Sequence, residues 1–480
     1  MQKLNNYING RNCDPLDGNW LDNYNPSNGQ VYSLVADSNA ADVENAYQAA
    51  KKAYPEWSNS TLEHRSQILM CLANLIEKNL DRLAAAEATD NGKPLSLAKT
   101  VDIPRASANF RFFAHAITQF SSESHESAGL DTINFTLRQP LGVVGCISPW
   151  NLPLYLFTWK IAPAIAAGNC VVAKPSEVTP MTAYLLSELL TEAGLPNGVL
   201  NIIQGTGPSA GQAIVQHPKI KAISFTGGTK TGEHIARTAA PMFKKLSLEL
   251  GGKNPNLIFA DCDYDAMLTT TVRSSFANQG QICLCGSRIY VEDSLYEKFK
   301  VDFLEKVSKL TVGDPFSNDT NLGALVSRPH LEKVQSFIDR AVEDGASLLF
   351  GGKKVTVPGL EKGYYLQPTV MEVTDNSCSI QQEEVFGPVV TLMKFSSEGE
   401  ALELANQSKY GLSATIWTSD LNRTMRLSKQ LEAGIVWVNT WLNRDLRTPF
   451  GGVKNSGMGR EGGLEALRFF TEPKNICIKY

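Results

Sequence analysis

Two side chains in the middle of the chain could supply a nucleophile and a base. Cys283 ends the run Phe276–Cys283, and Glu249 lies upstream in the run Leu248–Lys253. A cysteine thiolate can attack a carbonyl carbon, and a nearby carboxylate can then take a proton from the water that releases the product. Free cysteine is also among the residue types most often buried. The spacing alone therefore leaves a small structural cysteine as the alternative.

Glycine-rich segments indicate where a dinucleotide could bind. The run Phe225–Gly232 follows a strand-like segment, and a helix that begins near Thr229 would offer amides and its dipole to a pyrophosphate. Its spacing is not the usual fingerprint, so a plain turn is the alternative. The run Gly457–Gly462 has the literal Gly-x-Gly-x-x-Gly spacing, but too little chain follows for the strand and helix of a dinucleotide site. We expect a tight structural loop there.

Charged residues at the end of a predicted strand could hold a ribose. Lys174 and Glu177 follow the buried run Val171–Ala173, where an ammonium and a carboxylate could bind the two hydroxyls of an adenosine ribose. A solvated charged turn is the alternative. A carboxylate in this place would repel a 2′-phosphate, so the pair favours NAD over NADP.

The composition indicates a globular protein that acts on small molecules. The 480 residues suggest two or three domains, and the net charge of −4 comes without a basic stripe, which argues against nucleic acid as a partner. The polar start Met1–Asn6 predicts no secretory signal, and Lys160 and Pro163 interrupt the most apolar stretch, so we expect a cytoplasmic protein without a membrane span. Nine scattered cysteines predict neither a disulfide framework nor a metal site.

The hydrophobic pattern predicts a parallel sheet covered by helices. Buried strands are expected at Gly142–Ile147, Val171–Ala173 and Ala222–Phe225. A helix is expected after Thr179-Pro180, with Thr179 as its cap, and residues 40–86 have a helical period. The alternation of Asp131–Arg138 predicts a half-exposed strand, and another short strand is expected at Asn475–Lys479. The middle of the chain is therefore a doubly wound α/β unit.

Together with Pro149–Asn151 and Glu383–Pro388, these segments resemble those of the aldehyde dehydrogenase superfamily from about Tyr24 to Ile478. The resemblance implies an α/β fold in three parts. A doubly wound parallel-sheet NAD-binding domain would take residues 1–118 and 142–250, and an α/β catalytic domain would take 251–455. Residues 119–141 and 465–480 would form a small oligomerisation β-flap that reaches a neighbouring subunit in a homodimer or homotetramer.

The resemblance also implies residue roles. Cys283 would attack the aldehyde, the side-chain amide of Asn151 and the backbone amide of Cys283 would hold the oxyanion, and Glu249 would deprotonate the hydrolytic water. Taken without its neighbours, Asn151 could instead be a helix cap or a loop residue. Gly228 stands where the superfamily often carries serine or threonine. The residues that would bind NAD are Ile147, Pro149, Trp150, Lys174, Glu177, Gly207, Gly211, Phe225, Thr226, Gly227, Gly228, Gly232, Leu250, Glu384 and Phe386.

Arginines suggest the class of substrate. The segments around Arg105 and Val438–Arg447 resemble those of dehydrogenases for 2-aminomuconic and 2-hydroxymuconic semialdehydes. Arg105, Arg444 and Arg447 are the candidates for binding a substrate carboxylate through paired hydrogen bonds. Surface ion pairs with Asp102 or Asp445 are the alternative. A dehydrogenase for neutral or cationic aldehydes such as betaine aldehyde, or a non-catalytic member of the superfamily, are the competing functions.

Overall fold

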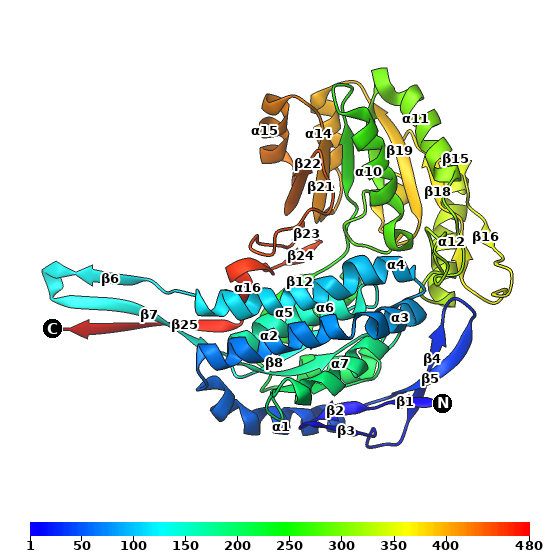
Figure 1. Ribbon diagram of the computed structural model, residues 1–480. Helices are drawn as coiled ribbons and strands as arrows, with labels where there is room; N and C mark the ends of the chain where they lie inside the picture. The colour runs from blue at the N-terminus through cyan, green and yellow to red at the C-terminus, as the bar shows by residue number, and fades with distance from the viewer.

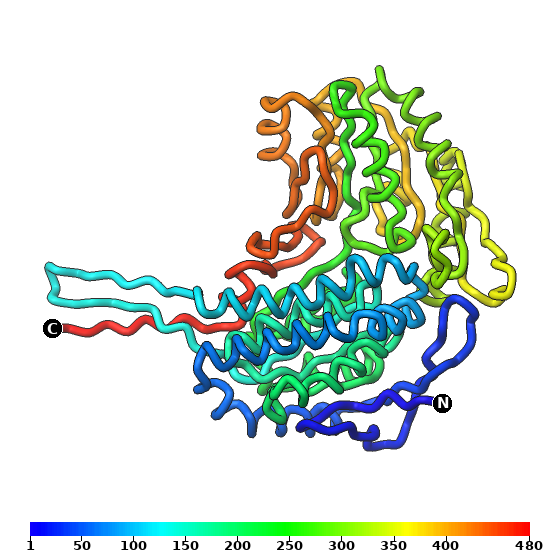
Figure 2. Tube along the Cα trace, viewed as in Figure 1, coloured from blue at the N-terminus to red at the C-terminus, as the bar shows by residue number.

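Two α/β bodies and a projecting arm make up the computed structural model, which describes residues 1–480 (Figure 1). The lower body in Figure 1 contains an eight-stranded sheet, and the upper body contains a seven-stranded sheet. The trace in Figure 2 shows the N-terminus beside the lower body and the C-terminus at the tip of the arm. A small sheet at the N-terminus combines β1 (Gln2–Leu4), β4 (Trp20–Asn25) and β5 (Gln30–Ala36).

The eight-stranded sheet has the order β24-β12-β11-β8-β9-β10-β2-β3. Its central strands are parallel and fully buried, as their continuous apolar runs predict. The predictions of strands at Gly142–Ile147, Val171–Ala173 and Ala222–Phe225 are confirmed within one or two residues. The strands are β2 (Asn6–Ile8), β3 (Arg11–Cys13), β8 (Val143–Ile147), β9 (Cys170–Lys174), β10 (Leu200–Ile202), β11 (Ala222–Thr226), β12 (Lys245–Glu249) and β24 (Gly457–Met458).

The carboxyl ends of four parallel strands meet at one edge of this sheet. Ile147 of β8 is paired with Lys174 of β9 on one side and with Phe225 of β11 on the other. Thr226, the last residue of β11, is paired with Glu249, the last residue of β12. In parallel sheets this edge is where ligands bind. The register therefore brings five candidate residues to one edge.

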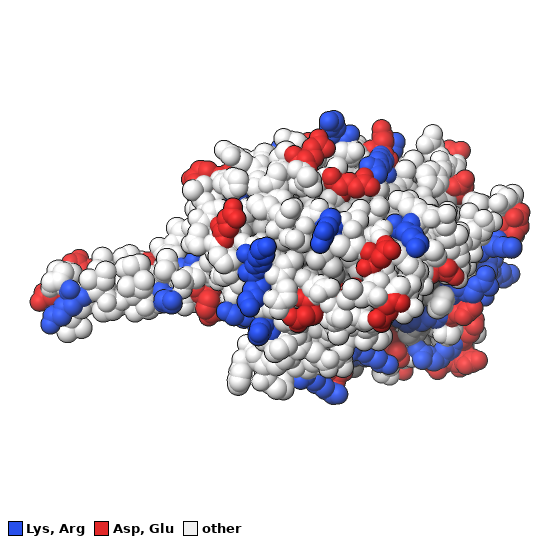
Figure 3. All heavy atoms as spheres, turned by 90° about the horizontal axis from the view of Figure 1, so that it is seen from below, with Lys and Arg blue, Asp and Glu red and all other residues white.

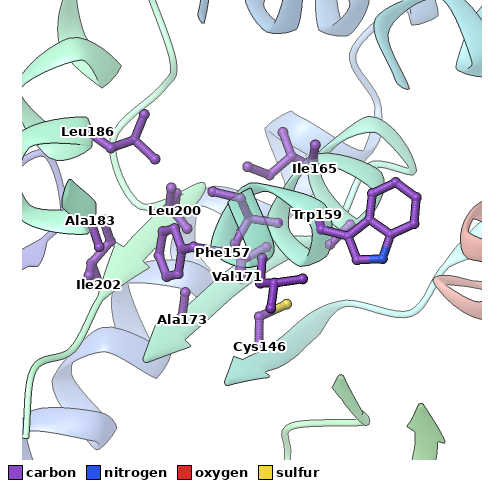
Figure 4. Packing of buried hydrophobic residues seen from close by; sticks show 14 of the residues in the cluster. Cys146, Phe157, Trp159, Ile165, Val171, Ala173, Ala183, Leu186, Leu200 and Ile202 are labelled. Carbon is purple, nitrogen blue, oxygen red and sulfur yellow. The ribbon is translucent and has the colours of Figure 1, made fainter. Parts of the chain in front are cut away.

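Helices cover the eight-stranded sheet, and the helical period of residues 40–86 is confirmed by three of them. All fourteen residues of α6 are buried, because α6 lies between α5 and the strands β8 and β9. Figure 4 shows Phe157 and Trp159 of α6 above Val171 and Cys146 of these strands. The helices are α1 (Ala40–Ser58), α2 (Leu62–Lys78), α3 (Leu80–Asn91), α4 (Leu95–Leu97), α5 (Ile103–Thr118), α6 (Pro153–Ala166), α7 (Met181–Glu192), α8 (Gln212–Gln216), α9 (Thr229–Ala239) and α16 (Gly463–Phe469).

One predicted helix cap is wrong. The helix α7 begins at Met181, and the capping position is taken by Pro180, which makes no side-chain cap hydrogen bond. The hydroxyl of Thr179 instead donates to the carbonyl of Trp150 at 3.2 Å. The threonine therefore ties the start of α7 to the segment that follows β8.

The seven-stranded sheet lies within residues 255–438 and has the order β15-β18-β19-β14-β13-β21-β22. Three hydrophobic clusters of its own surround it. Its strands are β13 (Pro255–Ile258), β14 (Arg288–Glu292), β15 (Ser347–Phe350), β18 (Thr369–Glu372), β19 (Val389–Phe395), β21 (Ser413–Trp417) and β22 (Ile435–Val438). Its helices are α10 (Tyr264–Phe276), α11 (Asp293–Ser308), α12 (Arg328–Glu343), α13 (Ser379–Gln382), α14 (Glu398–Asn406) and α15 (Leu421–Gln430). Two further strand pairs join β16 (Lys354–Val355) to β17 (Tyr365–Leu366) and β20 (Tyr410–Gly411) to β23 (Val453–Lys454).

The arm is a three-stranded antiparallel sheet of the order β25-β7-β6, with β6 at Ser124–Ser127, β7 at Thr132–Pro140 and β25 at Thr471–Lys479 (Figure 1). The strand expected at Asp131–Arg138 begins one residue later, because Asp131 adopts a left-handed conformation with φ of 50°. The C-terminal strand is longer than expected and begins at Thr471, whereas residues 465–469 are part of α16.

Neither a membrane span nor a single-signed surface is evident. No helix of the structure is both long and apolar enough to cross a bilayer. Figure 3 shows lysines and arginines interspersed with aspartates and glutamates over one face.

Candidate active site

Cys283 lies in an irregular segment between α10 and β14 that several hydrogen bonds hold in place. Asn278 and Gln279 are both left-handed, and the side chain of Gln279 donates to the carbonyl of Ala324 at 2.9 Å. A Cβ added to Gly280 would lie 2.1 Å from the carbonyl oxygen of Gly387, so only glycine fits there. The carbonyl of Cys283 accepts a hydrogen bond from Asn254 at 2.7 Å. The thiol is therefore carried by a tightly positioned backbone.

Two cavities meet at this thiol. The larger has a volume of about 500 Å³, and Cys283, Glu249, Arg105 and Arg444 all contribute to its wall. The smaller has a volume of about 180 Å³. Cys283 and Thr226 line both cavities. Residues of the smaller wall are Pro149, Trp150, Asn151, Thr226, Gly227, Gly228, Leu250, Gly251, Cys283, His330, Lys333, Glu384 and Phe386.

Glu249 ends β12 and is buried, and neither oxygen of its carboxyl group has a hydrogen-bond partner. Burial raises its pKa well above the usual value, and the neighbouring Glu461 raises it further, whereas Lys160 and Arg444 act in the opposite direction. A carboxylate whose pKa lies closer to neutrality is a stronger base than an ordinary exposed one. The site therefore contains a group that can accept a proton from water.

Glu461 is a neighbour of the base that the sequence analysis did not identify. One of its carboxylate oxygens accepts hydrogen bonds from Lys160 at 2.7 Å and from Ser224 at 2.9 Å. The residue lies in the run Gly457–Gly462, where a loop was expected; the first two residues instead form the strand β24 that pairs with β12, and only the rest of the run turns, with left-handed glycines at 459 and 462. In the sequence, this run was considered only for its glycine spacing, so Glu461, its one acidic residue, was not recognised as part of the site.

The side chain of Cys283 is only partly buried, yet its surroundings disfavour the thiolate. Burial raises its pKa, as do the neighbouring carboxylates Glu384 and Glu249, while Arg444 lowers it. These surroundings favour the thiol over the thiolate, so attack by the sulfur requires a proton acceptor.

Asn151 lies close to the nucleophile and does not cap a helix. Its side-chain nitrogen donates to the carbonyl of Gln281 at 3.0 Å, and α6 has Leu152 as its capping residue. The main-chain carbonyl of Asn151 accepts from Lys93 and Asn278, both at 3.0 Å. The backbone amide of Cys283 donates to no acceptor in the protein. The site thus has a side-chain amide and a free backbone amide beside one thiol.

Lys174 and Glu177 form a partly buried pair at the carboxyl edge of the sheet, with 3.0 Å between their charged groups. Burial alone would raise the pKa of Glu177, but the neighbouring Lys174 lowers it, and the net result is a pKa below the usual value. The carboxylate is therefore charged. The amide of Gly207 also faces this carboxylate, and a Cβ added to Gly211 would contact the side chain of Lys174 at 3.6 Å. These residues come together beside Ile147, which is paired with Lys174.

The run Phe225–Gly232 joins β11 to α9, as expected. Gly228 occupies the N-cap position of this eleven-residue helix. A Cβ added to Gly227 would lie 2.4 Å from the ring of Phe225, and a Cβ added to Gly232 would lie 2.4 Å from Leu250. A Cβ at Gly228 would meet nothing within 4 Å. A side chain at 227 or 232 would therefore have to displace Phe225 or Leu250, whereas Gly228 leaves open space at the end of the helix.

Glu384 and Phe386 close the smaller cavity from the second body. Glu384 accepts a hydrogen bond from the amide of Gly252 at 2.9 Å, and its burial raises its pKa to about 7. The ring of Phe386 packs edge-on against Trp150, with 5.2 Å between the ring centroids. His330 of α12, which no sequence signal identified, donates a hydrogen bond from its Nε2 to the carbonyl of Phe386 at 2.8 Å. Burial lowers the pKa of His330 to about 4, so the imidazole is neutral and its Nε2 is the donor.

The larger cavity brings two of the three candidate arginines together. Arg444 donates to the hydroxyl of Tyr155 at 2.8 Å and packs over the ring of Phe450 at 3.8 Å. Arg105 lies over the ring of the same tyrosine at 5.7 Å. Neither guanidinium forms an ion pair with a carboxylate of the protein. Both are consequently available to an anion.

Arg447, the third candidate arginine, does not line the larger cavity. Its guanidinium lies 2.6 Å from the carboxylate of Asp445, and 82% of its side chain is exposed. It lines a shallow depression outside the larger cavity rather than the cavity itself. The surface ion pair, which the sequence left as the alternative, is what the structure contains at this position. Asp102, by contrast, pairs with Lys93 and leaves Arg105 free.

The chain is similar in sequence and in structure to known aldehyde dehydrogenases. The model of the aldehyde dehydrogenase family matches residues 15–476. The chain is 49% identical to the 2-aminomuconic semialdehyde dehydrogenase of Homo sapiens, over 99% of this chain and 98% of that protein. It is 46% identical to the 2-hydroxymuconic semialdehyde dehydrogenase of Pseudomonas sp. (strain CF600), over the full length of both. The structure superimposes with a TM-score of 0.97 on the NAD+ complex of an aldehyde dehydrogenase from Bacillus cereus, at 37% identity, covering 100% of this chain and 97% of the other.

Proposed function

Since the chain belongs to the aldehyde dehydrogenase family, we propose that it oxidises an acidic semialdehyde, 2-aminomuconic or 2-hydroxymuconic 6-semialdehyde, to the carboxylic acid with NAD. The observation that carries the choice of substrate is the pair Arg105 and Arg444. Both guanidinium groups line the cavity of Cys283, both adjoin Tyr155, and neither has a carboxylate partner. A planar guanidinium binds a carboxylate through two parallel hydrogen bonds.

In the proposed reaction, the thiol of Cys283 gives up its proton to solvent, and the resulting thiolate forms a bond to the aldehyde carbon as the carbonyl double bond opens to an oxyanion. The oxyanion that develops would accept hydrogen bonds from the side chain of Asn151 and from the free amide of Cys283. Loss of one such donor typically costs roughly a hundredfold to a thousandfold in rate. After oxidation the acyl group is held on Cys283 as a thioester. Glu249 would then take a proton from water, which attacks the thioester and releases the acid.

The smaller cavity is the proposed site for the nicotinamide half of NAD. Its walls converge on Cys283, and the buried hydroxyls of Thr226 and Thr229 near this site have no hydrogen-bond partner in the protein. When bound, the cofactor supplies the acceptor for the hydride that leaves the thiohemiacetal carbon. Glu384 would hold the nicotinamide ribose, and Gly227 and the start of α9 would face the phosphates.

Lys174 and Glu177 would bind the adenosine ribose at the carboxyl edge of the sheet, beside Gly207 and Gly211. The remaining candidates, Ile147, Phe225, Gly232 and Leu250, would shape the wall behind the cofactor. Because Glu177 is charged, it would repel the 2′-phosphate of NADP. We therefore propose a preference for NAD.

A neutral or cationic aldehyde is the weaker candidate. Two guanidinium groups without counter-ions would repel the trimethylammonium of betaine aldehyde and would leave their donors unpaired against a neutral chain. A purely structural role is weaker still, because the thiol lies where the two cavities meet, with the carboxylate of Glu249 in the wall of the larger cavity and the amide of Asn151 in the wall of the smaller.

The direct test is NADH formation by the purified protein with 2-hydroxymuconic semialdehyde, 2-aminomuconic semialdehyde, betaine aldehyde and hexanal. We expect kcat/KM to be highest for the two acidic semialdehydes, by about tenfold or more, because a charged hydrogen-bonded pair contributes roughly 1.5–3 kcal/mol. Equal efficiency with hexanal would contradict the assignment of Arg105 and Arg444. The same assays with NADP in place of NAD test the cofactor preference.

We also propose that residues 1–118 and 142–250 act as the NAD-binding domain and residues 251–455 as the catalytic domain, while the arm packs on a second copy in a homodimer or homotetramer. The arm exposes Ile133, Leu137 and Ile478, an apolar surface that a three-stranded sheet cannot bury by itself. Light scattering of the purified protein would give the mass of the assembly. A monomer would contradict the role of the arm.

A further inference from the structure

The segment that carries Arg444 has a strained backbone. It follows β22 without regular secondary structure, and Leu442 within it is left-handed, with φ of 60°. A left-handed conformation is uncommon for a residue with a bulky side chain and costs free energy. Leu442 and Arg444 both line the larger cavity. Contacts with the rest of the protein must therefore hold this segment in its shape.

Trp441 connects this segment to the turn that carries the nucleophile. Its side chain is buried, and its indole N–H donates to the carbonyl of Leu284 at 2.9 Å. Leu284 directly follows Cys283 in the chain. The carbonyls on either side of Leu284, those of Cys283 and Cys285, both accept from the side chain of Asn254, at 2.7 and 2.9 Å. The partner of the indole is therefore itself fixed in position.

Two further hydrogen bonds hold the backbone on each side of Leu442. Arg273 of α10 donates to the carbonyl of Trp441 at 3.1 Å, and its guanidinium lies 5.6 Å from the centre of the indole ring. The indole N–H of Trp437 donates to the carbonyl of Asn443 at 3.0 Å. The strained residue is thus flanked by two anchored ones, and the arginine follows directly after them.

We propose that Trp441 is a positioning residue that fixes the separation between the sulfur of Cys283 and the guanidinium of Arg444. The site would then select its substrate by the number of carbons between the aldehyde and the carboxylate. The inference rests on the proposed function, because it requires Arg444 to bind a substrate carboxylate. It adds a requirement for one chain length, whatever other groups the chain carries. A carboxylate one carbon nearer or farther could not reach the guanidinium while the aldehyde carbon meets the thiol in a reactive geometry.

The test uses three acids of stepped length, 5-oxopentanoate, 6-oxohexanoate and 7-oxoheptanoate, and the neutral series pentanal, hexanal and heptanal. The full chain is assayed with NAD by the formation of NADH. The proposed substrates are 6-semialdehydes, so kcat/KM is expected to be highest for 6-oxohexanoate. We expect an advantage of about tenfold or more over the other two acids, because a displaced carboxylate loses hydrogen bonds to a charged group. The neutral aldehydes, which lack a carboxylate, should show no such maximum.

Trp441→Phe keeps an aromatic ring and removes the indole N–H. The ratio of kcat/KM for 6-oxohexanoate to that for 7-oxoheptanoate is expected to fall toward one, because the segment that carries Arg444 is released from the carbonyl of Leu284. The neutral series should keep its profile. Trp417→Phe is the matched control, because Trp417 is also buried but its indole N–H has no hydrogen-bond partner. This control should keep the ratio.

Two results with Trp441→Phe would overturn the inference. One is an unchanged ratio between the acids, and the other is an equal loss for all six aldehydes, which would make Trp441 a residue of the core alone. The absence of a maximum at 6-oxohexanoate in the unmodified protein would overturn it as well. If each acid is used no better than the neutral aldehyde of the same length, the arginine assignment fails, and the proposed function fails with it.

Should Trp441→Phe fail to fold, Arg273→Met decides the question. The side chain of Arg273 is exposed, and substitutions of exposed side chains usually leave stability almost unchanged. The variant removes the donor to the carbonyl of Trp441, so the ratio between the two acids is expected to fall in the same direction by a smaller factor. Loss of the positive charge alone would lower kcat/KM for all three acids alike and leave the ratio unchanged. That result would overturn the inference.

Discussion

The two cavities that meet at Cys283 are built in different ways. The smaller cavity is formed by strand ends, turns and glycines, such as Gly227 against the ring of Phe225 and the amide of Gly252 bound to Glu384. The larger cavity is formed by side chains from separate elements, with Arg105 on α5, Tyr155 on α6 and Arg444 in the segment after β22. The shape of the smaller cavity depends on backbone geometry, whereas that of the larger cavity depends on the placement of single side chains.

The difference shows why one side can vary more easily than the other. A substitution at Gly227 in the wall of the smaller cavity, or at Gly232 in α9 behind it, would put a Cβ 2.4 Å from a neighbouring side chain. A substitution of Arg444 would remove charge and hydrogen bonds but leave the backbone intact. We infer that cofactor binding is fixed by the fold, whereas substrate choice can change one residue at a time.

Cys283 belongs to both walls, so its removal gives the largest effect. In Cys283→Ala, turnover is expected to fall by a factor on the order of 10⁴ or more, because the covalent step is lost. NAD binding, measured by calorimetry, should persist because the smaller cavity keeps its other residues. Cys285→Ala is the control and should keep most of the activity. Turnover that survives in Cys283→Ala would assign the nucleophile elsewhere.

Glu249→Gln separates the two halves of the reaction. The steady-state rate is expected to fall roughly a hundredfold to ten-thousandfold, since the general base is lost, while a first turnover of NADH survives in stopped-flow measurements. The pKa of Glu249 is raised, so the carboxylate form is lost as the pH falls. The kcat of the unmodified protein should therefore rise with pH until Glu249 is deprotonated, and this rise should be absent from the variant.

A surface acid provides the control for this pH dependence. Glu465 is partly exposed and pairs with Arg468, so Glu465→Gln should keep both kcat and its dependence on pH. A pH profile that is the same in Glu249→Gln and in the unmodified protein would assign the titration to another group.

Arg444→Met tests the substrate side alone. We expect kcat/KM for 2-hydroxymuconic semialdehyde to fall by about tenfold to a hundredfold, because hydrogen bonds to a charged group are lost, while the value for hexanal changes less. Arg447→Met is the matched control, because Arg447 is paired with Asp445 outside the cavity. Equal losses in the two variants would remove the distinction between a cavity arginine and a surface arginine.

Glu177→Gln gives the smallest effect and concerns the cofactor side. Removing the charge beside Lys174 should weaken the preference for NAD over NADP by roughly tenfold or less, since the repulsion of a 2′-phosphate is partly screened by water. The ratio of kcat/KM for the two cofactors is the measurement. Glu188→Gln, on the exposed face of α7, should leave this ratio unchanged. A ratio that does not respond to Glu177→Gln would contradict the ribose assignment.

The sequence predicts the smaller cavity better than the larger one. Runs such as Phe225–Gly232 and Glu383–Pro388 are contiguous, so their order in the chain is also their order in the site. The buried strands β8, β9 and β11 are predictable because continuous apolar runs have few other uses. Asp131 and Thr179 were misassigned since a left-handed residue and a tertiary hydrogen bond override local preference.

The larger cavity is lined by residues whose sequence context predicts a different role. Tyr155 lies in a fully buried, mostly apolar helix and has the pattern of a core residue. Lys93, Glu87 and Asp102 have the composition of a solvated charged face, and they are buried only because α3 and α5 enclose them. Such positions are set by tertiary packing, which a single sequence does not express.

The pairing of β12 with β24 links the base to the timing of synthesis. Glu249 lies opposite Gly457, so the strand that carries the base has an open edge until the chain beyond the second body has been made. At about 5–20 residues per second, that interval lasts roughly tens of seconds. During it an unpaired strand edge is available for wrong contacts. A nascent or truncated chain without its last segment would therefore carry the thiol and the carboxylate but not the completed sheet edge, Glu461 or Arg444, and the active centre would be the last part of the molecule to form.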